Sequence, residues 1–183
     1  MKITYLVLGP FMTNTYIIYD ENTMDAVIID PSFTPENIIR AVAQLKVNVK
    51  GIFLTHGHVD HMAGLNKLKG VYKEARVYMN INDNEYLSDP KKNLYFTVLD
   101  TSGHTPGGIS FYMEKEKVVF TGDSLFRESI GRTDFPGGDI KRLLQTIRKN
   151  LFSLSDEVIV LPGHGEATSI GYEKKHNPFL VGG

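Results

Sequence analysis

Short apolar blocks alternate with polar turn residues along this chain. Three early blocks have the composition of strands, at residues 2–8, 14–20 and 25–30, and the third runs into Asp30-Pro31. Thr34 and Pro35 then have the residue types of a helix N-cap and a first helical position. Apolar residues follow at helical spacing, so the pattern predicts a helix that begins after Thr34 and runs to about Leu45.

The rest of the chain continues this alternation of strands and helices. Further strands are predicted at residues 51–55, 76–80, 94–100, 108–113, 117–121 and 157–161. Further helices are predicted at residues 60–72, 81–88, 139–150 and 168–176. No linker, repeat or low-complexity segment interrupts the pattern, which predicts a single α/β layered domain over residues 1–183.

Composition and charge narrow the function classes. The formal net charge of -1 gives no general attraction to nucleic acid or to anionic membranes, so neither is expected as a partner. The chain has no cysteine, which excludes a thiolate nucleophile, cysteine zinc sites and iron–sulfur clusters. No apolar run reaches transmembrane length and the N-terminus lacks a signal-peptide pattern, so we expect a cytoplasmic enzyme with a small-molecule substrate. The sequence does not indicate the oligomeric state.

Five of the six histidines follow one scheme. Three of them lie in the segment Thr55-His56-Gly57-His58-Val59-Asp60-His61. His56 and His58 can converge on one divalent ion from an extended turn, while Asp60 and His61 at a helix start can point to a second ion. The sixth, His176, lies in a polar tail without ligand-like neighbours, and we interpret it as a surface residue.

The other candidate ligands each follow an apolar run. The runs 95–99, 118–120 and 158–161 lead to His104, Asp123 and His164, as the run 52–54 leads to His56. Ligands of open α/β sheets collect in the loops beyond the strand ends, and each of these loops carries glycine. The sequence therefore predicts that seven side chains form a metal centre, namely His56, His58, Asp60, His61, His104, Asp123 and His164.

These motifs resemble the metallo-β-lactamase superfamily, and in particular its small glyoxalase II-like members. The segments that carry the resemblance are Thr55–His61, Phe120–Phe126, Gly131–Gly137, Leu161–Gly165 and Asn177–Phe179. The resemblance implies a four-layer αβ/βα sandwich with two divalent metal ions at one edge, zinc in the first place and iron or manganese as alternatives. It also implies that His56, His58 and His104 hold the first metal, that Asp60, His61 and His164 hold the second, and that Asp123 bridges both.

The expected reaction is hydrolysis of a small thioester, such as an acyl-glutathione, by a hydroxide held between the metals. Asp60 is expected to orient this nucleophile as well as bind metal. Two further residues each have a functional and a structural interpretation. Asp30 is either a hydrogen-bond partner of a ligand histidine or an Asp-Pro turn residue. Arg132 either binds a substrate carboxylate or forms a salt bridge within its loop. Because 19 residues follow His164, we expect no counterpart of the helical domain that helps to bind glutathione in full-length glyoxalase II.

Other functions of the same fold remain open at this point. The segment Gly131–Phe135 also resembles persulfide dioxygenases, which use one iron held by residues that match His56, His104 and Asp123. Phosphodiester cleavage would call for a basic surface, and a non-catalytic scaffold would be expected to lack some of the ligands. The absence of cysteine separates the chain from lactamases with a cysteine in the second site, so antibiotic hydrolysis is not expected.

Overall fold

The computed structural model describes residues 1–83 and 96–181, and its first half is a five-stranded sheet with helices on one face. The sheet order is β1-β2-β3-β4-β5, where the first three strands pair antiparallel and the last three pair parallel. Its elements are β1 (Lys2–Leu8), β2 (Thr13–Tyr19), β3 (Asp25–Ile29), α1 (Pro35–Leu45), β4 (Asn48–Phe53), α2 (Val59–Met62), α3 (Leu65–Val71) and β5 (Arg76–Tyr78).

The second half contains another five-stranded sheet, in the order β12-β11-β8-β7-β6. In this sheet β8 and β11 pair parallel, and the other neighbours pair antiparallel. The elements are β6 (Thr97–Asp100), β7 (Ile109–Met113), β8 (Val118–Gly122), the short hairpin β9 (Leu125–Phe126) and β10 (Ser129–Ile130), α4 (Ile140–Thr146), a π-helical turn (Ile147–Leu151), β11 (Ile159–Pro162), β12 (Thr168–Ser169) and α5 (Ile170–His176).

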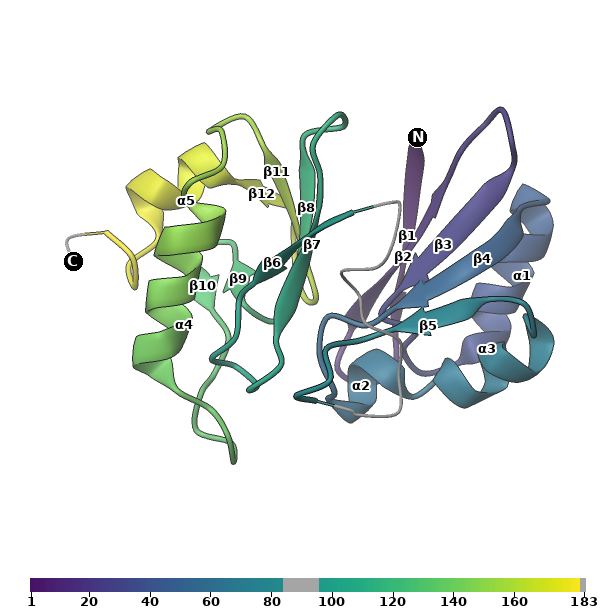
Figure 1. The fold of residues 1–183 in the computed structure, drawn as a ribbon, viewed down its shortest axis with the longest axis horizontal. Coiled ribbons are helices and arrows are strands. Elements are labelled where there is room, and N and C mark those ends of the chain that lie inside the picture. The colour runs from purple at the N-terminus through teal and green to yellow at the C-terminus, as the bar shows by residue number, and fades with distance from the viewer. Residues whose placement is uncertain (84–95, 182–183) are drawn as a thin grey trace.

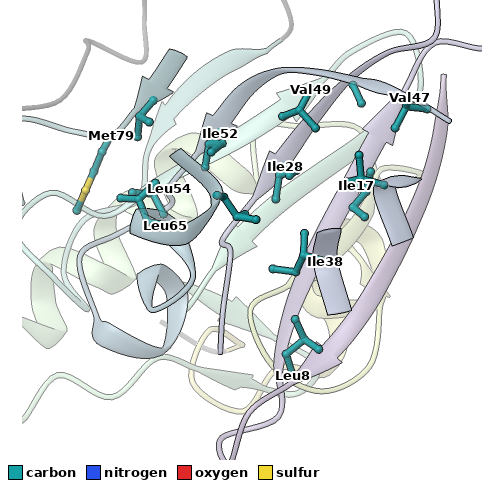
Figure 2. Packing of buried hydrophobic residues seen from close by; sticks show 14 residues of the cluster. Leu8, Ile17, Ile28, Ile38, Val47, Val49, Ile52, Leu54, Leu65 and Met79 are labelled. Atoms are coloured by element: carbon teal, nitrogen blue, oxygen red, sulfur yellow. The ribbon is translucent and has the colours of Figure 1, made fainter. Parts of the chain in front are cut away.

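The two sheets face each other and the helices lie outside, which confirms the predicted αβ/βα sandwich (Figure 1). Strand β2 illustrates why both faces of the first sheet are covered. Its residue Ile17 packs under the outer helices, while its neighbour Ile18 packs between the sheets. Figure 2 shows the outer cluster, in which Ile17, Ile28 and Ile52 of the first sheet meet Ile38 of α1. Strands buried on both faces read as nearly continuous apolar runs, as these do.

Three local predictions need correction. Thr34 is not a side-chain cap of α1, because its backbone is left-handed (φ 57°) and its hydroxyl donates to the carbonyl of Phe33. The helix predicted over residues 60–72 is divided into α2 and α3: between them, the backbone N–H of Gly64 donates to the carbonyl of Pro31 at 2.9 Å instead of to the preceding helical turn. The last predicted helix begins at Ile170, because residues 168–169 form strand β12.

The predicted strand 94–100 begins at Thr97 among the described residues. Of the predicted helix 81–88, residues 81–83 form a turn and the remainder lies outside the described residues. Within residues 1–83 and 96–181, no helix has the length and apolar character required to cross a membrane.

Candidate metal centre

Four loops at the same end of the two sheets carry the predicted ligands. The segment after β4 supplies His56 and His58, and the short helix α2 that follows carries Asp60 and His61. Asp123 directly follows β8, and His164 lies two residues beyond β11. Because β8 and β11 are parallel neighbours, their carboxyl ends meet at one edge. His104, in the loop between β6 and β7, completes the set.

The seven side chains converge into overlapping groups. Within each group the candidate ligand atoms lie within 4.8 Å of one another: His56, His58 and His104 form one group, Asp60, His61 and His164 another, and His56, His61 and Asp123 a third. Asp123 lies between the first two groups. Its Oδ1 is 3.3 Å from Nε2 of His61, and its Oδ2 is 3.4 Å from Nε2 of His164 and 3.6 Å from Nε2 of His104.

Hydrogen bonds from outside the cluster set the orientation of the imidazoles. Nδ1 of His61 pairs with Asp30 at 2.9 Å, Nδ1 of His104 with the carbonyl of Arg132 at 2.7 Å, and Nδ1 of His164 with the carbonyl of Phe11 at 3.0 Å. Since these oxygens accept, each ring carries a proton on Nδ1 and turns Nε2 inward, where it can bind a metal ion once any proton on Nε2 is displaced. His58 faces the cluster with Nδ1 instead, 2.9 Å from Nε2 of His104.

Two buried atoms at the centre lack a hydrogen-bond partner. They are Nε2 of His56, in a side chain that is 2% exposed, and Oδ1 of Asp123. Unsatisfied buried polar atoms are costly, and an ion is one of the few groups that would satisfy a lone pair of nitrogen and a lone pair of oxygen at once. Imidazole and carboxylate donors are also the set that zinc and iron accept in proteins. The residues therefore fit two divalent ions.

Two central residues are in the protonation states that bind a cation. Burial raises the pKa of Asp123, but the charge of His61 and the close approach of His164 and His61 outweigh it, so this pKa lies well below its usual range. Burial, reinforced by the positive charge of His61, lowers the pKa of His56 well below its usual value, which leaves the ring neutral. An ionised carboxylate and a neutral imidazole are the protonation states that bind metals.

Asp30 lies next to the cluster, where it is hydrogen-bonded to one of the histidines. Its carboxylate pairs with His61 and also accepts the backbone N–H of Thr55 at 2.8 Å and the hydroxyl of Thr55 at 2.7 Å. The Thr55 hydroxyl in turn lies 3.0 Å from Nδ1 of His56. One buried carboxylate thus supports a histidine of each proposed metal site.

Arg132 contributes through its backbone in this structure. Its carbonyl orients His104, while its exposed guanidinium forms a bidentate pair with Asp134 and lies 4.0 Å from the ring centre of Phe135. His176 lies at the end of α5, exposed and against the ring of Tyr172, and it belongs to none of the three groups.

Asp83 is a residue of this region that the sequence did not indicate. Its carboxylate accepts the backbone N–H of Gly57 at 3.0 Å, the backbone N–H of Gly107 at 2.5 Å and the hydroxyl of Thr105 at 2.8 Å. It therefore ties the loop of His56 and His58 to the loop of His104. An Asn-Asp-Asn turn is too ordinary a signal to predict this role.

Comparison with known proteins agrees with this geometry. Residues 8–99 and 94–164 match the family described as the Metallo-beta-lactamase superfamily. The chain belongs to the metallo-β-lactamase superfamily. The prediction of a metal-binding member of this superfamily is thereby confirmed.

Full-length relatives within the superfamily carry different names. Hydroxyacylglutathione hydrolase GloC of Haemophilus influenzae is 36% identical, and the match covers 98% of each chain. Among solved structures, BLEG-1 B3 metallo-beta-lactamase is 34% identical with a TM-score of 0.93, covering 99% of this chain and 100% of that one. ETHE1 from Myxococcus xanthus is 34% identical with a TM-score of 0.90, covering 100% and 85%. TTHA1623, solved in a di-iron-bound form, is 33% identical with a TM-score of 0.86, covering 97% and 100%.

Proposed function

We propose that this superfamily member is a dinuclear metal-dependent hydrolase that cleaves a small thioester, such as an acyl-glutathione. The observation that carries the proposal is the position of Asp123 between two complete ligand groups, which suits a pair of ions rather than one. The full-length likeness to a hydroxyacylglutathione hydrolase supports the thioester as substrate.

Two bound divalent ions would lower the pKa of water to near neutrality and polarise the thioester carbonyl. His56, His58 and His104 would hold the first ion, Asp60, His61 and His164 the second, and Asp123 would contact both. In this proposal zinc is the first candidate, and iron or manganese would suit the same donors.

Asp60 is the residue that we propose for orienting the nucleophilic water. Burial raises its pKa, but the hydrogen bond with His164, the charge of His61 and the hydroxyl of Thr13 outweigh burial and lower it. The carboxylate is therefore ionised at neutral pH. The Thr13 hydroxyl donates to its Oδ2 at 3.0 Å and so fixes the carboxylate while leaving it able to accept a further hydrogen bond. Thiolate is a good leaving group, so no separate general acid is required.

A second candidate function is that of a mononuclear-iron persulfide dioxygenase. The specific observation that favours it is the likeness to ETHE1 over the full length of this chain. Under this alternative, His56, His104 and Asp123 would hold one iron, and the second ligand group would have no catalytic metal.

The test is a substrate panel with metal content measured on the same preparation, purified without oxygen. Acyl-glutathione, acyl-coenzyme A, a lactone and a β-lactam would be compared for hydrolysis, and a glutathione persulfide for oxygen uptake. We expect two metal ions per chain, release of free thiol from a thioester and no oxygen uptake. One iron per chain with oxygen uptake would favour the alternative, and a dimetal protein that cleaves no thioester would refute the proposal.

A further inference from the structure

A cavity of about 450 Å³ opens beside the metal centre, between the β1–β2 hairpin and the segment after β11. The backbone N–H of Asn14 donates to the carbonyl of Gly163 at 2.7 Å, which fixes the hairpin against that segment. The side chain of Asn14 donates to the carbonyls of Pro162 and Gly165, each at 3.0 Å. The walls of the cavity are therefore held by hydrogen bonds from buried groups.

The cavity is lined mainly by apolar side chains that remain exposed to solvent. Tyr5 and Val7 lie two positions apart on β1, so they share one face of the strand, and Phe11 and Met12 form the turn that follows. Their exposed fractions are 59%, 48%, 61% and 65%, respectively. A contiguous exposed apolar patch beside a cavity is typical of a ligand-binding surface.

Two polar side chains of the cavity already have partners. Tyr16 donates its hydroxyl to the carbonyl of Pro162 at 2.6 Å, and the exposed carboxylate of Glu166 pairs with Arg127. None of the described residues that line the cavity is lysine or arginine. Apart from His164, which faces the metal centre, a carboxylate or phosphate would therefore find no counter-charge among these residues, whereas a hydrocarbon group would find apolar contact.

His164 connects this cavity to the metal centre. Its Nε2 lies 3.3 Å from Nε2 of His61 inside the cluster, and its ring also lines the cavity. The opposite end of the cluster differs: His58 lies against Phe135, and the exposed guanidinium of Arg132, paired with Asp134, lies over the same ring. The centre thus has an apolar end at His164 and an end with exposed charged groups at Arg132 and Asp134.

We propose that the cavity beside His164 binds the hydrocarbon part of the acyl group of the substrate, with the charged thiol carrier directed to the Arg132 end. This inference rests on the proposed thioesterase function and adds the substrate class, a thioester with an acyl chain of several apolar carbons. Such a chain reaches the cavity while its carbonyl stays at the metal centre, because His164 borders both.

The test is a series of thioesters with one thiol and acyl chains from two to ten carbons. In the wild type we expect kcat/KM to rise about fourfold for each added methylene until the cavity is filled, as expected for burial of apolar surface. Val7→Ser should reduce this factor to below about twofold. The matched control is Val71→Ser on α3, a valine of equal exposure (46% against 48%) on the outer helical layer, which should leave the whole series unchanged.

Met12→Asn provides a second variant, since asparagine tolerates the left-handed backbone of this residue (φ 54°) and the turn is exposed. It should also flatten the series.

A wild-type series without dependence on acyl length would overturn the inference, as would a dependence on the alkyl length of the thiol instead. If no thioester of any length is cleaved, the proposed function fails. In that case, the binding of an uncleavable acyl-thioether series is measured by calorimetry. An affinity that rises with chain length supports the cavity as a hydrocarbon site, and an affinity that stays flat overturns it.

Discussion

Asp30 and His61, 31 positions apart in the sequence, are joined by a hydrogen bond of 2.9 Å between Oδ2 and Nδ1. Asp30 has a left-handed backbone (φ 49°) at the end of β3, and both of its oxygens are engaged by His61 and Thr55. The carboxylate therefore holds the proton of His61 on Nδ1 and directs Nε2 toward Asp60, Asp123 and His164.

Asp30→Asn should weaken binding at the second metal site. An amide would place an N–H toward His61, and asparagine still tolerates the left-handed backbone. Loss of such an outer partner lowers metal affinity by about 10- to 100-fold. Zinc titration against a chromophoric chelator measures the effect, with Asp156→Asn, an exposed carboxylate paired with Lys174, as the control. Equal affinities in wild type and Asp30→Asn would contradict this role.

Asp123→Ala should remove metal and activity together. Its two oxygens lie 3.3 to 3.6 Å from Nε2 of His61, His164 and His104, so the change affects both proposed sites. The loss of activity should exceed the roughly 100-fold expected for an outer partner. Metal analysis after dialysis, combined with thioester turnover, is the measurement. Full activity with two bound metals would exclude Asp123 as a ligand.

Metal-free protein should show a pH dependence that arises from His164. Burial lowers the pKa of this histidine, but its hydrogen bonds with Asp123 and Asp60 outweigh burial and raise it to about 10, above the ordinary value of 6.5. A raised folded-state pKa stabilises the folded protein fully below pH 6.5, and this stabilisation is lost as the pH rises through 10.

The comparison is therefore between metal-free wild type and His164→Gln in urea denaturation with chelator present. The wild type should be the more stable protein near pH 6.5, and the difference in unfolding free energy should shrink toward pH 10. The difference between the two proteins cancels the titration of groups that do not interact with His164, and so reports His164 together with its partners Asp60 and Asp123. A difference that grows with pH would show that His164 is not held protonated by the two carboxylates.

The sequence predicted those parts of the fold and site that depend on local patterns. The apolar runs located most of the strands, and the spacing of His56, His58, Asp60 and His61 indicated the metal cluster that the structure brings together. Features set by distant packing were missed. At the break between α2 and α3 the Gly64 N–H donates to the carbonyl of Pro31, 33 positions away, whereas apolar helical spacing continues through this point.

Other features are too short or too ordinary to predict. The two-residue strands β9, β10 and β12 offer no periodicity to detect. The lining of the cavity beside His164 comes from two distant segments, residues 5–16 and 161–167, which only the folded chain places together. Asp83 accepts hydrogen bonds from residues 26 and 22 positions away from it, Gly57 and Thr105.

Asp83→Asn should weaken the first metal site selectively. The carboxylate accepts from both Gly57 and Gly107, and an asparagine amide can accept from only one of them while its N–H groups oppose the other. The His58 and His104 loops would separate, while Asp60, His61 and His164 keep their supports. We expect the zinc affinity of the first site, and not that of the second, to fall by about tenfold or more. Asp25→Asn, an exposed partner of Lys50, is the control, and equal loss at both sites would contradict a local role.

Gly163→Ala should disrupt the metal centre through a single methyl group. A Cβ at this position would lie 2.3 Å from Oδ1 of Asp123 and 2.6 Å from Cε1 of His61, both of which the cluster requires in place. We expect metal content to fall and the unfolding free energy to drop by about 1–3 kcal/mol, as is typical of overpacking. Gly70→Ala on α3 is the matched control, because its Cβ would meet nothing within 4 Å. That change should leave metal content intact and stabilise the helix by about 0.5–1 kcal/mol. Metal analysis and urea denaturation are carried out on both variants. Their comparison separates the effect of the methyl group at the site from the effect of replacing glycine itself. Full metal retention in Gly163→Ala would refute the close approach on which this prediction depends.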